Sequence, residues 1–151
     1  MPSEPSADLK IVERLQVLDP KGVPSNLIIR HGDPFQLAIE FDITSPTVRA
    51  VLCALEFEIK YTAESLGPNP EVDLGTVRGN TVAGQYKYDA TTPAGATTAL
   101  DVPSGALSPD TIYKLGAVLT FNVRCPGAGT PVNRFPLFAF TDSTNILVTS
   151  T

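Results

Sequence analysis

The sequence predicts an all-β protein, folded as a two-sheet antiparallel sandwich with Greek-key connections and about seven to nine strands. Three observations predict this fold class. Apolar and polar residues alternate with a period of two through long stretches, the pattern of strands that bury one face. Proline and glycine interrupt these stretches, and no window shows a convincing apolar stripe of helical period. The 151 residues are 42% hydrophobic and 18% charged, a composition typical of a globular protein with a hydrophobic core.

The chain is expected to form one domain. Residues 1–8 contain prolines and acidic residues and are predicted to be a flexible N-terminal tail. Residues 9–151 contain no internal repeat and no linker that would divide them, which predicts a single β-sandwich domain. The stretch from Ile11 to Leu18 fits either a helical turn or a strand, and Pro20 and Gly22 end it in both cases.

The clearest alternation runs from Phe35 to Ile43, where every odd-numbered residue is apolar. The same parity continues from about Arg49 to Thr62, with Phe57 as an expected core residue. The last long strand is predicted from Thr111 to Arg124, with Leu119 in the core. Such one-sided burial is what a sheet packed on a second sheet requires. Shorter strands are expected at Val72–Val77, Gln85–Ala90, Thr98–Val102, Phe138–Thr141 and Asn145–Val148.

The segment from Leu107 to Leu115 reads Leu-Ser-Pro-Asp-Thr-Ile-Tyr-Lys-Leu. It resembles the entry to the sixth strand of fibronectin type III domains, which belong to the immunoglobulin-like β-sandwiches. The resemblance implies that Tyr113 forms a structural tyrosine corner, its hydroxyl bonding backbone a few residues upstream, and that Leu107 lies beneath the turn. The chain departs from antibody domains because it has no tryptophan and no cysteine on the expected second strand. The resemblance covers the fold only, because this architecture hosts many functions.

Charge and hydropathy exclude several classes of partner. The net charge is −5, and no run of Lys or Arg is present, which argues against binding to nucleic acid or to an anionic membrane surface. No apolar stretch approaches the roughly 20 residues of a membrane-spanning helix. The N-terminus lacks the basic and apolar regions of a signal peptide. We therefore expect a cytoplasmic protein, or one in a particle exported by a route that reads no N-terminal signal.

The chain carries no recognisable catalytic residues. His31 is the only histidine, and in its His-Gly-Asp-Pro context we expect a solvated turn residue. Hydrolases that need a base beside the nucleophile, and metal sites built from several imidazoles, are therefore disfavoured. Glu56 and Glu58 share the solvent face of one strand and are interpreted as a solubilising stripe. The sequence predicts no enzyme activity, no cofactor and no metal.

Cys53 and Cys125 both fall on the inward parity of their strands. In a sandwich of this type those strands are neighbours, which would bring the two thiols close together. Since no export signal is present, we interpret them as separate buried thiols, while a disulfide between them stays an open alternative.

Exclusion of these chemistries favours a non-catalytic protein-interaction or assembly module that binds a protein partner or a second copy of itself. In the segment from Phe135 to Phe140 we expect the phenylalanines to point inward and Leu137 to point outward as an exposed apolar spot. The closing strands lack charge, and such an edge favours strand addition by another chain. The candidate interaction edge comprises Leu137, Asn145 and Leu147.

Two alternative functions stay open. One is a structural subunit of a phage-like or secretion particle. The other is a small-ligand or carbohydrate-binding domain that uses the loops at one end of the sandwich, with Tyr61, Tyr86 and Tyr88 as candidate aromatic platforms. Whether the stretch from Ile11 to Leu18 covers the candidate edge is also open.

Overall fold

The computed structural model describes residues 9–12, 14–52, 55–68, 70–93, 95–123, 133–141 and 143–150, and for residues 133–136 it describes the backbone alone. Within these ranges the chain forms twelve strands and one short helix, more strands than the sequence predicted. The elements are β1 (Leu9–Ile11), β2 (Gln16–Leu18), β3 (Ile28–Arg30), β4 (Phe35–Ala38), β5 (Phe41–Ile43), α1 (Pro46–Ala50), β6 (Leu55–Ser65), β7 (Val72–Asn80), β8 (Lys87–Tyr88), β9 (Leu100–Val102), β10 (Thr111–Val123), β11 (Asn133–Phe140) and β12 (Thr144–Thr149).

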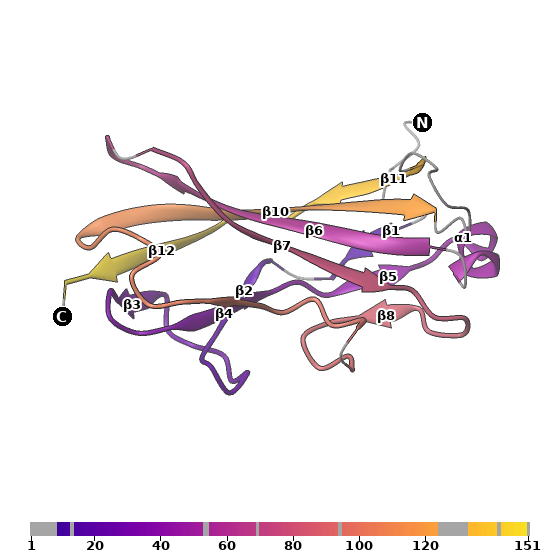
Figure 1. Ribbon diagram of the computed structural model, residues 1–151, viewed down its shortest axis with the longest axis horizontal. Coiled ribbons are helices and arrows are strands. Elements are labelled where there is room, and N and C mark those ends of the chain that lie inside the picture. The colour runs from indigo at the N-terminus through magenta and orange to yellow at the C-terminus, as the bar shows by residue number, and fades with distance from the viewer. Residues whose placement is uncertain are drawn as a thin grey trace.

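The strands lie in two layers (Figure 1). One layer is a six-stranded sheet in which β7, β6, β10, β12 and β3 are neighbours in that order. β6 pairs with β10 along its whole length, so β11 and β12 share the other side of β10, one after the other. The second layer consists of two three-stranded sheets, β1-β5-β8 and β2-β4-β9. The prediction of an all-β class is confirmed.

The core lies between the layers, and it follows the predicted alternation. Phe57 of β6 and Leu119 of β10 are fully buried, as the sequence predicted. Phe41 of β5 stacks on Tyr88 with 5.1 Å between ring centroids and meets the Phe121 ring edge-on at 5.9 Å. These aromatic contacts join β5 and β8 of one layer to β10 of the other, so a single hydrophobic cluster runs through both layers.

Gly79 of β7 makes room for the ring of Phe57 on the neighbouring strand β6. Gly79 is the cross-strand partner of Phe57, and a Cβ atom at this position would overlap the Phe57 ring. The ring of Phe57 therefore covers the backbone of the neighbouring strand, a packing that any larger residue at position 79 would obstruct.

The strand predicted from Arg49 to Thr62 begins later than expected, at Leu55, because α1 precedes it. Ser45 is the N-cap of α1, and its Oγ accepts a hydrogen bond from the Val48 N–H at 3.3 Å. Pro46 occupies the first turn, where its missing N–H costs nothing. A capped helical turn therefore replaces the first residues of the predicted strand.

The strand predicted from Phe35 to Ile43 is divided into β4 and β5, although its buried parity holds throughout. At the division the Ile39 carbonyl accepts from the Thr98 hydroxyl at 2.6 Å, and the Glu40 carbonyl accepts from the Val12 N–H at 3.0 Å. These contacts satisfy the backbone where the ladder is interrupted. The expected second sheet is consequently two smaller sheets.

The prediction of a wholly antiparallel fold is wrong at one position. β3, which the sequence did not predict, pairs in parallel with β12, so that Ile28 lies opposite Leu147. Its three residues are too few to display a period-2 pattern. Among the described residues, no helix has the length and apolar character needed to cross a membrane.

Candidate functional site

Two residues that the sequence singled out fasten the loop before β10 to the rest of the molecule. Tyr113 is fully buried, and its hydroxyl accepts a hydrogen bond from the Ser108 N–H at 2.9 Å, five residues upstream. His31 is half-buried, with Nδ1 2.8 Å from the Leu107 carbonyl, while its own carbonyl accepts from the Gly105 N–H at 2.9 Å. His31 is thus a tertiary contact of this loop and not the solvated turn residue that we expected.

The candidate interaction edge is only partly where the sequence placed it. Leu137 is 6% exposed, so the expected outward orientation of this side chain is wrong. Leu147 is partly exposed, but the far side of β12 is occupied by β3, and the Leu147 N–H donates to the Leu27 carbonyl at 2.9 Å. Asn145 is exposed. The strand that pairs with β12 is thus β3 and not the stretch from Ile11 to Leu18, which contacts the start of β12 through a hydrogen bond from the Thr144 hydroxyl to the Leu15 carbonyl at 2.9 Å.

β11 contains a bulge that leaves its parity unchanged: on both sides of it, odd-numbered residues pair with odd-numbered residues of β10, whose buried face is also odd, so Leu137 points inward. Thr120 pairs with Phe138, but the next residue of β10, Phe121, pairs with Phe135, so Pro136 and Leu137 are additional residues in β11. Proline lacks the N–H that a regular ladder needs, and it is tolerated at such an irregularity. Beyond the bulge the strand resumes with its odd-numbered residues facing the core.

The exposed apolar residues of β11 are Phe138 and Phe140, with 53% and 66% of their surfaces accessible. Their rings lie edge to face with centroids 5.6 Å apart on the outer side of the six-stranded sheet. Between them Ala139 pairs with Leu119. We call Phe138, Ala139 and Phe140 the aromatic edge.

In the aromatic edge, the backbone N–H and C=O groups of Phe138 and Phe140 point away from β10. Thr141 donates its N–H to the Ala117 carbonyl at 3.1 Å, which identifies Thr141 and, two residues earlier, Ala139 as the residues that bond to β10. The alternating geometry of antiparallel pairs then turns the N–H and C=O groups of Phe138 and Phe140 outward. Among the described residues no strand pairs with this side of β11.

A second exposed apolar surface crosses the same face at the other end of β10. Leu147 of β12 pairs with Ile112 of β10 on one side and with Ile28 of β3 on the other. On the far side of β10, Leu66, which directly follows β6, donates its N–H to the Ile112 carbonyl. Cross-strand neighbours project from the same face of a sheet. This aliphatic row consists of Leu66, Ile112, Leu147 and Ile28, which are 58%, 48%, 36% and 62% exposed.

A shallow groove of about 210 Å³ lies between the two apolar surfaces. Gly116 forms part of its floor, where the nearest atom to an added Cβ would be 4.0 Å away. Glu64, Lys114 and Phe140 are among the residues that line it. The groove is open to solvent and lies on the face of the sheet, not among the end loops that the sequence analysis considered for ligand binding.

The three tyrosines considered as platforms for a sugar ring are not available as a group. Tyr61 and Tyr88 are fully buried, and the Arg49 guanidinium lies 4.0 Å above the ring of Tyr86. Tyr61 donates its hydroxyl to the Thr98 carbonyl at 2.6 Å. Burial raises the pKa of the Tyr61 hydroxyl far above its ordinary value.

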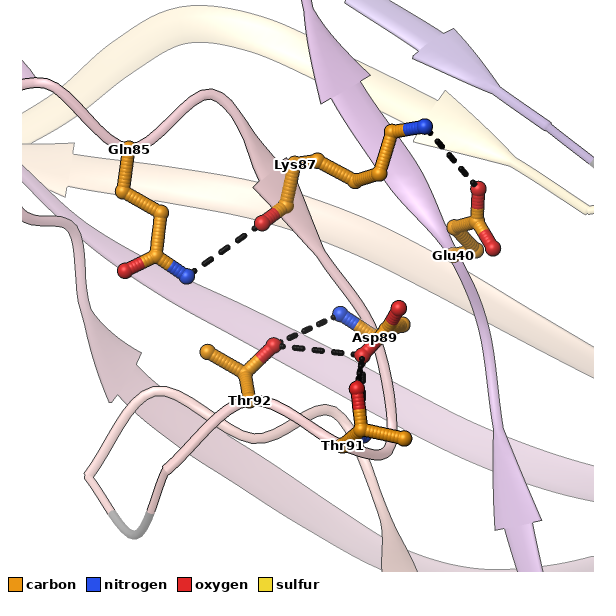
Figure 2. Close-up of polar contacts among 6 residues, drawn as sticks. All are labelled: Glu40, Gln85, Lys87, Asp89, Thr91 and Thr92. Atoms are coloured by element: carbon orange, nitrogen blue, oxygen red, sulfur yellow. Dashed lines mark hydrogen bonds and ion pairs between the residues drawn. The ribbon is translucent and has the colours of Figure 1, made fainter.

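Polar side chains near β8 form local contacts (Figure 2). Asp89 accepts hydrogen bonds from the Thr91 N–H at 2.8 Å and from the Thr91 hydroxyl at 2.6 Å, so its carboxylate is used within its own turn. Lys87 lies 3.9 Å from the Glu40 carboxylate in an ion pair whose lysine is well exposed. Within the described ranges no group of three or more histidines, cysteines or acidic residues is placed to hold a metal ion.

The remaining residues that drew attention in the sequence are the N-terminal tail, the two cysteines and two glutamates of β6. The N-terminal tail of residues 1–8, Cys53 and Cys125 lie outside the described residues. Glu56 and Glu58 lie on the outer face of β6 and are half-buried, and Glu58 forms an ion pair with Arg78 at 3.3 Å.

Solved structures resemble the chain in fold. The structure described as the C-terminal domain of wzt superposes with a TM-score of 0.55 over 96% of this chain and 75% of that chain, at 12% sequence identity. This likeness extends to the β-rich fold alone. No protein-family model matches the chain, and no curated protein matches it either.

Proposed function

We propose that the chain is a non-catalytic association module that binds a protein strand at the aromatic edge. The observation that carries the proposal is the exposure of Phe138 and Phe140 on a strand whose outward backbone groups have no described partner. A strand that adds there would take up these hydrogen bonds and cover both rings. A subunit of a larger particle would use the same edge, so that alternative is one form of this proposal.

The other strand edges support the choice of β11. The outer strands β1, β2, β3, β8 and β9 have two or three residues each, and short edge strands are poor templates for pairing. β7 and β11 are the two long edge strands. Of these, β7 carries Asp73 and Arg78 along its length, whereas β11 carries Arg134 before its bulge and no charged residue from Leu137 to Phe140.

We further propose that the fold is immunoglobulin-like or fibronectin III-like. The contact from Ser108 to the Tyr113 hydroxyl supports this, because it joins the residues that the sequence resemblance pairs. Tyr113→Phe removes the acceptor and should lower the free energy of unfolding by about 1–3 kcal/mol. A variant that unfolds in denaturant like the parent would remove the support.

The association proposal is tested with Phe140→Lys and a matched control, Thr76→Lys. Thr76 and Phe140 belong to the same cross-strand row, at opposite edges of the sheet, with Lys60 and Val118 between them. We expect the parent and Thr76→Lys to self-associate or to retain a protein from the native lysate, and Phe140→Lys to do neither. A parent that is monomeric and retains no partner would refute the proposal.

A second candidate function is the binding of a small polar ligand in the groove beside Gly116. Carboxylate, ammonium and aromatic groups line the groove together, which suits a hydroxyl-rich ligand such as a sugar. Gly116→Val fills the floor and should abolish binding to a glycan array if the parent binds there. No binding by the parent across such an array would remove this candidate.

A further inference from the structure

We propose that the strand received at the aromatic edge belongs to a second copy of this chain, so that two β11 strands pair antiparallel and the six-stranded sheets join across the dimer. This inference rests on the proposed function and names its partner. In the pairing, Ala139 lies on the two-fold axis and Phe138 lies opposite the partner's Phe140.

The register follows from which residues have outward backbone groups. Phe138 and Phe140 direct their N–H and C=O groups away from β10, and Ala139 directs its groups toward β10. In an antiparallel pair the outward residues must bond to outward residues of the other strand. A two-fold axis at Ala139 meets this condition, because it maps Phe138 of one copy onto the position opposite Phe140 of the other.

The same register is self-complementary in its side chains. Residues that pair across antiparallel strands project from the same face, so each Phe138 ring lies beside a Phe140 ring of the other copy. Four rings, which are edge to face within each copy at 5.6 Å, then form one cluster on the outer face of the joined sheet.

Charge also favours a second copy over a different protein. A charged group close to a two-fold axis lies near its own copy, so like charges there repel. Interfaces between different proteins commonly pair unlike charges, which set partner choice. Between Leu137 and Thr141 the chain has no charge. This suits pairing with a second copy, and it provides no charge by which a different protein could be selected.

The area available indicates a weak dimer. With 53% and 66% of their surfaces exposed, two rings that bury about 150–250 Å² each when fully covered contribute roughly 180–300 Å² per copy. Stable interfaces bury about 1,200–2,000 Å² in total, so this one belongs to the transient class. We therefore expect a dissociation constant in the micromolar range, about 1–100 µM.

A pair of charge variants tests the register. Phe138→Glu and Phe140→Lys each place a charge against a phenylalanine in their own homodimers, and each should weaken dimerisation at least about tenfold. Mixed together, the introduced carboxylate lies opposite the introduced ammonium, and the remaining pair is phenylalanine against phenylalanine. Sedimentation equilibrium should show monomers for each variant alone and a heterodimer for the mixture. Thr76→Lys should dimerise like the parent, and circular dichroism checks that every variant is folded.

Each outcome is decisive for one of the two proposals. Variants that stay monomeric when mixed, beside a parent that dimerises, overturn the register. A parent that is monomeric at about 300 µM, well above the expected dissociation constant, overturns the second copy as partner. If such a parent still retains a protein from the native lysate and Phe140→Lys does not, the proposed association function stands. If neither retains a protein, both proposals fail.

Discussion

The two long edges of the six-stranded sheet differ in how they meet solvent. On β7, Asp73 and Arg78 form ion pairs with β6, at 3.9 Å to Lys60 and 3.3 Å to Glu58. The pairing of β7 is also irregular beside Gly75, whose φ of +136° few other residues adopt. On β11, Phe138 and Phe140 lie in the cross-strand rows of Arg78 and Thr76, and both rings are exposed.

The difference between β7 and β11 concerns association with other chains more than the stability of the fold. Charges and irregularities on β7 are the features by which natural sheets discourage pairing with other chains. Exposed ion pairs contribute little to folding, so their place on β7 is better explained by protection of the edge. Both edges face the same solvent, but on β11 the charge at Arg134 and the bulge at Pro136 precede Leu137, and the segment Phe138–Phe140 is regular and uncharged. An unprotected segment in a chain that protects its other long edge is therefore a candidate for use.

The largest expected effect separates the core from the aromatic edge. Phe57→Ala removes a fully buried ring and should lower the free energy of unfolding by about 3–5 kcal/mol. Phe140→Ala removes an exposed ring of the same size and should change it by less than about 0.5 kcal/mol. Chemical denaturation of the monomer measures both. A large loss in Phe140→Ala would mean that this ring serves the fold and not a partner.

A smaller effect tests how β7 is held. Gly79→Ala inserts a Cβ where the Phe57 ring lies and should cost about 1–3 kcal/mol by overpacking. Gly116→Ala is the matched control on β10, where the added Cβ has 4.0 Å of space, and it should cost less than about 1 kcal/mol. Equal midpoints of unfolding for the two variants would contradict the described packing of β6 against β7.

The buried Tyr61 hydroxyl predicts a loss of stability in alkali. Because burial raises the pKa of Tyr61 in the folded state, the unfolded chain loses this proton first as the pH rises. The contribution is fully present below the ordinary tyrosine pKa of about 10 and falls by about 1.4 kcal/mol per pH unit above it. Unfolding measured from pH 8 to 11 should therefore be less pH-dependent in Tyr61→Phe than in the parent. Equal slopes would contradict the assignment.

The smallest effect on stability comes from removing the charges of β7. Asp73→Val combined with Arg78→Val should change the free energy of unfolding by less than about 1 kcal/mol, since the Asp73 and Arg78 side chains are well exposed. The variant should nevertheless self-associate more strongly than the parent, because β7 then presents a long edge without charge. Light scattering after size-exclusion chromatography measures the mass. An unchanged mass would show that the irregular pairing at Gly75 protects this edge without help from charge.

The long strands could be predicted from sequence because their burial is one-sided and continuous. Every inward position of β10 from Tyr113 to Phe121 is apolar and buried. The elements that were missed depend on contacts from elsewhere in the chain. β3 forms by pairing with β12. At the break between β4 and β5, Thr98 and Val12 donate hydrogen bonds to the free carbonyls. The local sequence pattern predicts neither contact.

The exposed apolar residues of the closing segment are not the ones that the sequence predicted. The phenylalanines were predicted to point inward and Leu137 outward, whereas the odd-numbered residues of β11 pair with the buried, odd-numbered residues of β10. Phe135 has the opposite parity to Phe138 and Phe140, so the three rings cannot share one face of a regular strand. The bulge at Pro136 adds two residues and so preserves this parity, which leaves Leu137 buried and Phe138 and Phe140 exposed.

Amide hydrogen exchange of β11 tests the central claim most directly. Ala139 bonds to β10 in the monomer, so its N–H should be protected whether or not the protein is associated. The N–H groups of Phe138 and Phe140 point outward and should exchange fast in dilute protein, then become protected as the concentration rises or a partner is added. The amides of β7 should show no such dependence. Exchange at Phe138 and Phe140 that stays fast in the associated state would contradict the claim that the aromatic edge receives a strand.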